Sequence, residues 1–118
     1  MMEYDNMFWE YLERLLKENE IVIDRPKGSS HPKFCDKIYP TDYGYIKNTK
    51  SMDGAGIDVF IGAKIKKNVD AILCNIDLYR NDSEIKILIG CTENEEDEIY
   101  NFMNNWETMK AIMIRRNN

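Results

Sequence analysis

The stretch from residue 39 to residue 62, YPTDYGYIKNTKSMDGAGIDVFIG, constrains the fold of this chain more than any other part of it. Tyr39 and Tyr43 precede a pair of aspartates, Asp53 and Asp58, with glycines between them, and an apolar run typical of a strand follows. Carboxylates on a glycine-permissive loop suit a hard cation such as Mg²⁺, which prefers oxygen ligands and often shares them with phosphate. The stretch therefore predicts an ion-binding loop beside a strand of a sheet.

Hydrophobic periodicity predicts a helix near each end of the chain. Residues 5–19 have the apolar spacing of one helical face, with Asp5 as the expected N-cap. Residues 92–95, TENE, match a capping box that starts a second helix. The apolar stripe of this second helix consists of Ile99, Phe102, Met103 and Trp106.

Segments rich in Val, Ile, Leu and Tyr predict six strands, which are separated by polar turns. They are residues 21–23, 43–46, 58–65, 69–79, 84–90 and 109–114. The joints at residues 66–68 and 80–83 are short, which predicts two hairpins of antiparallel strands. Residues 24–30 are expected to form a loop, and the tail at residues 115–118 is expected to fray. We therefore expect an α+β fold: a small, curled, mostly antiparallel sheet or barrel with an N-terminal and a C-terminal helix.

Composition excludes several classes of protein. A length of 118 residues fits one domain that spans residues 1–118. The net charge of −5 argues against nucleic acid as a partner. No apolar run has membrane length, and residues 1–10 do not resemble a signal peptide, so no membrane is expected. Three cysteines without C-x-x-C spacing support neither disulfides nor zinc, and they favour the cytoplasm.

Acidic residues recur at the ends of several predicted strands. Asp24 ends the first strand, Asp53 and Asp58 flank the glycine-rich loop, and Asp82 and Glu84 lie on a turn. If the sheet curls, these side chains can converge on one cavity mouth, where they would repel one another unless cations neutralised them. The neighbouring cations are Arg25, Lys27, Lys33 and Lys86. Such a mixture suits an anionic phosphate ester or anhydride bound with a metal ion.

These residues resemble those of the soluble (family I) inorganic pyrophosphatases, which are Mg²⁺-dependent. The signature of that family is Tyr-Pro-x-x-Tyr-Gly followed by Asp-Gly-Asp-Pro-x-Asp-Val. Further matches are IVIDRP at residues 21–26, Lys33-Phe34 and the turn at residues 78–86, so that the resemblance spans residues 20–90. The chain is also similar to a group of short bacterial pyrophosphatase-like proteins. The resemblance implies an OB-like sheet with a pyrophosphate or other phosphoanhydride substrate, Mg²⁺ as cofactor and, as an open alternative, a homo-oligomer.

The resemblance also implies a role for each matching residue. The metal ligands would be Asp53, Asp58, Asp82 and Glu84. Asp58 would in addition help to generate the attacking hydroxide, with Asp24 and Tyr43 as further catalytic residues. The residues that bind phosphate would be Lys33, Tyr39, Lys86 and Arg25.

The chain departs from the family pattern at several of its positions. Ala55 replaces the middle aspartate of the Asp-Gly-Asp-Pro run, so one metal ligand is missing. Cys35 replaces a glutamate, and Trp106-Glu107 aligns with a Tyr-Lys pair, which reverses a charge. The arginine expected before the Tyr-Pro run has no clear counterpart. These departures predict weaker metal binding or a different substrate.

Plainer interpretations remain for single residues. Asp53 and its neighbours could form an ordinary turn, and Tyr39 and Tyr43 could be core aromatics. His31 is expected to be solvated and has no assigned role. The aromatic cluster Tyr4, Phe8, Trp9 and Tyr11 fits either the core, which is favoured, or an oligomer surface. The leading hypothesis is a phosphoanhydride hydrolase; the alternatives are a non-catalytic phosphate- or nucleotide-binding module and a structural interaction domain.

Overall fold

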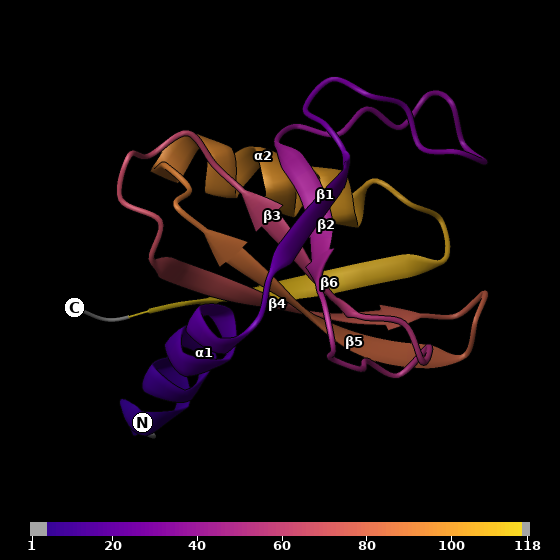
Figure 1. Cartoon of the computed structure of the whole chain (residues 1–118). Helices are drawn as coiled ribbons and strands as arrows, with labels where there is room; N and C mark the ends of the chain where they lie inside the picture. Colours follow the sequence, from indigo (N-terminus) through magenta and orange to yellow (C-terminus); the bar gives the residue numbers. More distant parts are fainter. Residues whose placement is uncertain (1–4, 117–118) are drawn as a thin grey trace.

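Two helices and six strands make up the computed structural model, which describes residues 5–116 (Figure 1). The strands form one sheet in the order β1-β2-β3-β5-β4-β6. The elements are α1 (Met7–Glu18), β1 (Ile21–Arg25), β2 (Asp42–Ile46), β3 (Ile57–Ile61), β4 (Val69–Asp77), β5 (Asp82–Ile89), α2 (Glu93–Asn104) and β6 (Met109–Arg115). The α+β expectation is confirmed, as an open sheet with β1 and β6 at its edges and not as a closed barrel.

Strand pairing is antiparallel everywhere except between β3 and β5, which run parallel with Phe60 opposite Leu88. The hairpin predicted at residues 80–83 is confirmed, because β4 and β5 pair directly across it. The hairpin predicted at residues 66–68 is wrong, because β5 lies between β3 and β4. After β3 the chain follows the end of β5: the amides of Gly62 and Lys64 donate to the carbonyls of Ile89 and Gly90.

Each helix covers a different face of the sheet (Figure 1). The α2 face is built on Tyr43, Phe60 and Leu88, packed against Ile99 and Met103 of the helix. The α1 face holds Trp9, Ile46, Val59, Val69, Ile72, Ile87 and Ile89. Neighbouring residues of β3 and β5 therefore enter opposite cores, as the two-residue period of a strand requires.

The first helix differs from its prediction in two respects. It begins at Met7 with Asn6 at the N-cap position, so the predicted N-cap Asp5 is wrong by one residue, although its Oδ1 accepts from the Met7 amide at 2.8 Å. Of the aromatic cluster, Trp9 is buried, whereas Phe8 and Tyr11 are 43% and 60% exposed, so the expected core position is wrong for these two. Tyr4 lies outside the described residues. In the described part of the chain, neither helix is long and apolar enough to cross a membrane.

The capping box of α2 is confirmed: the Thr92 side chain accepts from the Glu95 amide, and the Glu95 carboxylate accepts from the Thr92 amide. The helix ends at Asn104, so Trp106 lies beyond it and packs against Phe102. The predicted last strand is confirmed as β6, which includes Arg115. The Arg116 amide donates to the Asp70 carbonyl, so the predicted fraying does not begin at residue 115; Asn117 and Asn118 lie outside the described residues.

Gly44 sets how closely β1 approaches β2. A Cβ atom on this glycine would lie 1.8 Å from the carbonyl oxygen of Val22, so no other residue fits without moving β1. Opposite Gly44, a register shift between Ile23 and Arg25 leaves Asp24 out of the ladder and places Arg25 opposite Tyr43. The tight pairing therefore brings the Arg25 side chain to the tyrosines of the 39–62 stretch.

Candidate active site

Lys86 of β5 is at the centre of a polar cluster on the α2 side of the sheet. Its Nζ atom donates to the Tyr43 hydroxyl at 2.8 Å, to Asp58 Oδ2 at 2.7 Å and to Glu84 Oε2 at 3.3 Å. The partners come from β2, β3 and β5, which are neighbours in the sheet. Lys86 is only 7% exposed, so its charge is compensated inside the protein.

The environment of Lys86 keeps it protonated. Burial lowers the pKa of its ammonium, but the Tyr43 hydroxyl and the Asp58 carboxylate outweigh burial, and the net shift is upward. Burial also raises the pKa of Tyr43, whose hydroxyl stays neutral. The cluster therefore presents a fixed positive charge and a neutral hydroxyl side by side.

Asp58 and Glu84 bind this lysine, and a third carboxylate, Asp53, acts on Glu84. Burial raises the pKa of Glu84, and the negative charges of Asp53 and Asp58 add to that rise, against the opposing effect of Lys86. Burial acts in the same direction on Asp53, but hydrogen bonds from Ser51 Oγ at 2.7 Å and from the Ala55 amide at 2.9 Å hold its pKa below the ordinary value. Mutual repulsion of this kind favours the binding of a cation.

Arg25 extends the cluster toward the edge of the sheet. Its guanidinium donates to the Tyr39 hydroxyl and lies over the rings of Tyr39 and Tyr43, 5.5 and 5.6 Å from their centroids. The two tyrosine rings are 4.9 Å apart. Arg25, Tyr39, Tyr43 and Lys86 thus form a continuous row of hydroxyls and cations, the chemistry that grips an anion such as phosphate.

Three of the residues predicted for the site stand apart from this cluster. Asp24 is the exposed bulge residue of β1, Lys33 is exposed in the loop between β1 and β2, and Asp82 begins β5 opposite Asp77. Within residues 5–116, no hydrogen bond or ion pair joins these three side chains to Asp58, Glu84 or Lys86. The structure therefore brings together the other predicted residues: Arg25, Tyr39, Tyr43, Asp53, Asp58, Glu84 and Lys86.

The cluster fits a hard divalent ion in its chemistry, although it is not arranged as a finished site. Across the described residues, no three His, Cys, Asp or Glu side chains are already placed to hold one ion. The available donors are carboxylate oxygens, which Mg²⁺ prefers. Two cations occupy them instead: Lys86 binds Asp58 and Glu84, and Arg80 Nη1 lies 3.7 Å from Asp53 Oδ2. A metal ion would have to compete with these side chains.

Arg80 and His31 were not predicted as site residues. Arg80 lies in the turn between β4 and β5, and the one sequence signal for it is that this turn leads to Glu84 and Lys86. His31 is partly exposed, as expected, but it also has partners: its ring packs 5.3 Å from that of Trp106, and its Nδ1 accepts from the Lys33 and Phe34 amides. Burial lowers the pKa of His31, and the positive charges of Arg25, Lys33 and Arg80 lower it further.

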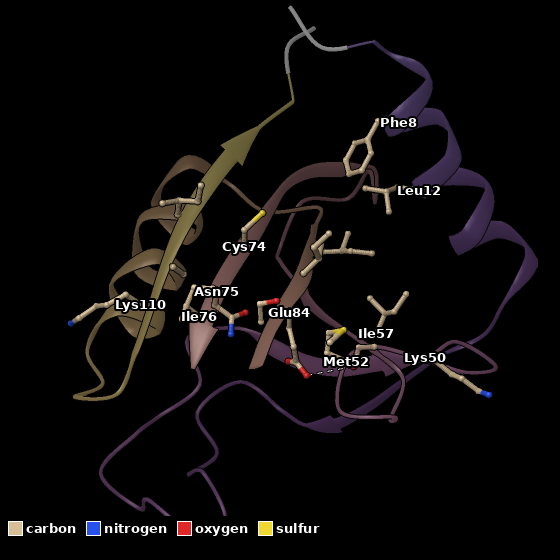
Figure 2. Close-up of a pocket in the computed structure, with 16 residues that line it drawn as sticks. Phe8, Leu12, Lys50, Met52, Ile57, Cys74, Asn75, Ile76, Glu84 and Lys110 are labelled. Atoms are coloured by element: carbon tan, nitrogen blue, oxygen red, sulfur yellow. Dashed lines mark hydrogen bonds between the residues drawn. The ribbon is translucent and has the colours of Figure 1, made fainter. Parts of the chain in front are cut away.

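A cavity lies behind this cluster, on the α1 face of the sheet (Figure 2). It has a volume of about 910 Å³ and is lined mainly by apolar side chains, among them Phe8, Leu12, Ile76, Ile85 and Ile112. Figure 2 shows the Glu84 carboxylate at one end of it, close to Met52; Glu84 Oε1 accepts from Ser51 at 3.5 Å. The cavity and the polar cluster therefore share the segment that precedes Asp53.

Comparisons with known proteins agree with this fold. A family model described as inorganic pyrophosphatase matches residues 15–115. An inorganic pyrophosphatase structure from Neisseria gonorrhoeae is similar with a TM-score of 0.66 and 17% identity, covering 80% of each chain. One from Helicobacter pylori has a TM-score of 0.62 and 15% identity, covering 81% of this chain and 83% of that one. One from Thermus thermophilus has a TM-score of 0.57 and 20% identity, covering 81% of each. No curated protein sequence matches significantly.

Proposed function

The chain belongs to the inorganic pyrophosphatase family, whose model matches residues 15–115, and we propose that it hydrolyses inorganic pyrophosphate to two phosphates with the help of Mg²⁺. One observation carries this proposal: Lys86 is buried between Asp58 and Glu84 and donates to Tyr43. Fixed cations, hydroxyls and carboxylates within reach of one another are what an anhydride with four negative charges needs. The free cysteines of the described chain fit action in the reducing cytoplasm.

The carboxylates are proposed to hold the divalent ion. Asp53, Asp58 and Glu84 would supply the first oxygens, with Asp82 as a fourth ligand from the start of β5. When bound, such an ion supplies Lewis-acid chemistry: it makes water more acidic and draws charge from phosphoryl oxygens. Asp58, whose Oδ2 accepts a hydrogen bond from Lys86, would take the proton of the attacking water.

The row of cations and hydroxyls is proposed to bind the substrate. Lys86 and Tyr43 would hold one phosphoryl group, while Arg25 and Tyr39 would hold the other. As water attacks phosphorus, the bond from that phosphorus to the bridging oxygen breaks, and the charge that develops on the leaving phosphate faces the Arg25 guanidinium. Asp24 is exposed next to Arg25 in β1, and Lys33 is exposed in the loop that follows; both would act on the phosphoryl group that Arg25 holds.

A second candidate function is a phosphate- or nucleotide-binding module without catalysis. Ala55 favours it, because this residue lies in the Asp53 loop at the position where the family has a third carboxylate, and its side chain offers no ligand. The same substitution is compatible with a working enzyme of reduced activity or altered substrate. The two functions differ in turnover and not in ligand binding.

Measurement of phosphate release separates the two. Pyrophosphate and a panel of nucleoside triphosphates are incubated with the protein, with Mg²⁺ or with a chelator. We expect release from pyrophosphate that depends on Mg²⁺. If no substrate is turned over while calorimetry still detects binding of pyrophosphate, the enzyme proposal is wrong and the binding module replaces it.

A further inference from the structure

Arg80 lies between the carboxylates of the candidate active site and the cation-rich loop. On one side its Nη1 is 3.7 Å from Asp53 Oδ2. On the other side it faces His31, whose ring lies 6.4 Å from the ring of Tyr39; the positive charges of Arg80, Arg25 and Lys33 all lower the pKa of this histidine. The turn between β4 and β5 therefore delivers a guanidinium to the border between the proposed metal ligands and the proposed phosphate ligands.

The two oxygens of Asp53 have different partners. Oδ1 accepts from Ser51 Oγ and from the Ala55 amide, and it is fixed by both. Oδ2 has Arg80 as its ion-pair partner. The oxygen that is free of backbone and hydroxyl donors is thus the one that Arg80 neutralises, so a divalent ion and the guanidinium compete for the same position.

Arg80 can leave that position more easily than Lys86 can leave its own. The Lys86 side chain is 8% exposed and has three partners at 2.7–3.3 Å. The Arg80 side chain is 57% exposed, and its contact with Asp53 is longer than a hydrogen bond. A guanidinium displaced from Asp53 keeps its charge and its fork of donors, which matches the geometry of a phosphate.

We propose that Arg80 is a further substrate-binding residue, which neutralises Asp53 in the metal-free protein and donates to the substrate's phosphate once a divalent ion has taken Asp53 Oδ2. This inference rests on the proposed function. It supplies the arginine that the family pattern led us to expect before the Tyr-Pro run, from a different part of the chain. It also predicts that Arg80 opposes metal binding and assists phosphate binding.

Removal of the Arg80 charge should strengthen metal binding and weaken phosphate binding, and these opposite effects make the test specific. In the variant Arg80→Gln, calorimetry with Mg²⁺ alone should show affinity that is tighter by about 2- to 5-fold, because an exposed competing ion pair is removed. The affinity for imidodiphosphate, a pyrophosphate analogue that resists hydrolysis, should fall about tenfold in the presence of Mg²⁺. Arg80→Lys should lose less analogue affinity than Arg80→Gln. The fold should persist, because it is the backbone amide of Arg80 that donates to Asp77 Oδ1.

Arg14→Gln is the matched control, since Arg14 is an exposed arginine with a single acid partner, Glu18, at 3.9 Å on α1. It removes the same charge and should change neither affinity. If Arg80→Gln weakens Mg²⁺ binding, or leaves analogue binding unchanged, Arg80 is a structural or incidental surface residue and the inference is wrong. Neither readout needs turnover, so a wild-type protein that binds the analogue without hydrolysing pyrophosphate contradicts the proposed function alone.

Discussion

The Nζ atom of Lys86 lies 2.7 Å from Oδ2 of Asp58, across the parallel pair that β3 forms with β5. A parallel pair cannot be formed by a simple hairpin, so this contact forms only when β5 inserts between β3 and β4. The ion pair is nearly buried and also lies at the centre of the proposed active site. Folding and function therefore depend on the same atoms, and suitable substitutions can separate them.

Replacement of Lys86 by methionine should destabilise the protein by about 3 kcal/mol at neutral pH, because Asp58 and Glu84 lose the cation that neutralises them. Mg²⁺ should then raise the melting temperature of Lys86→Met more than that of the wild type, since the free carboxylates bind it without competition. Thermal unfolding with and without Mg²⁺ measures both effects.

Lys64→Met is the control for this prediction, because Lys64 pairs with Asp70 at 3.3 Å but its side chain is 47% exposed. It removes the same charge and should cost little stability. A Lys86→Met protein whose melting temperature does not respond to Mg²⁺ would show that the carboxylates around Lys86 do not form a metal site.

The raised pKa of Glu84 predicts an unusual pH dependence. Burial and the charges of Asp53 and Asp58 raise this pKa above its ordinary value of 4.5, so the folded protein holds the proton more tightly than the unfolded chain does. The stabilising contribution of protonated Glu84 is present below pH 4.5 and is lost as the pH rises through the folded-state pKa. In metal-free buffer, Glu84→Gln should therefore be more stable than the wild type at about pH 7, and this advantage should shrink toward about pH 4.

Urea unfolding midpoints between about pH 4 and pH 7 test this dependence. Glu98→Gln, at an exposed position of α2, is the control and should show no comparable change with pH. If Glu84→Gln is less stable than the wild type near neutral pH, its ion pair with Lys86 outweighs the repulsion from the two aspartates, and the predicted direction is wrong.

Asp58→Asn should remove activity while it leaves the fold stable. The amide oxygen can still accept from Lys86, but it neither binds a divalent ion strongly nor takes a proton from water. We expect the rate of Mg²⁺-dependent phosphate release to fall at least about a hundredfold. The free energy of unfolding should change little, because the hydrogen bond to Lys86 is kept. Asp97→Asn, at an exposed residue that pairs with Arg115, should retain full activity. Equal activity of both variants would remove Asp58 from the catalytic residues.

The sequence predicts the elements of this fold better than their order in the sheet. Helical periodicity and the capping box locate α1 and α2, because these signals are local. The short joint after β3 also predicts a hairpin from local sequence alone, but this prediction is wrong. Residues 86–89 of β5 are buried on both faces, and this burial favours a central place between β3 and β4. Such competition between strands for the interior is not visible in any single segment.

The same limit applies to the candidate site. The motif residues Tyr43, Asp58 and Lys86 meet because fixed register positions carry them to one face of the sheet. Asp24 belongs to the resemblance as well, but a bulge turns it out of the ladder, and a single sequence does not reveal a bulge. Arg80, in contrast, belongs to the site but is not predicted from the sequence. Charged residues are common in turns, and only the folded turn shows that Arg80 faces Asp53.

Gly44→Ala should be among the most destabilising small substitutions in the chain. Its Cβ would meet the Val22 carbonyl at 1.8 Å, and because that atom is backbone, β1 must shift away from β2. We expect a loss of about 3 kcal/mol in unfolding free energy, from overpacking at a site that cannot relax. Because β1 carries Arg25 to Tyr39, the KM for pyrophosphate should also rise.

Gly54→Ala is the comparison: its Cβ would meet nothing within 4 Å, but its φ of +83° should cost about 1 kcal/mol. If urea unfolding finds Gly44→Ala no less stable than Gly54→Ala, the tight β1–β2 contact is not what holds Arg25 in place.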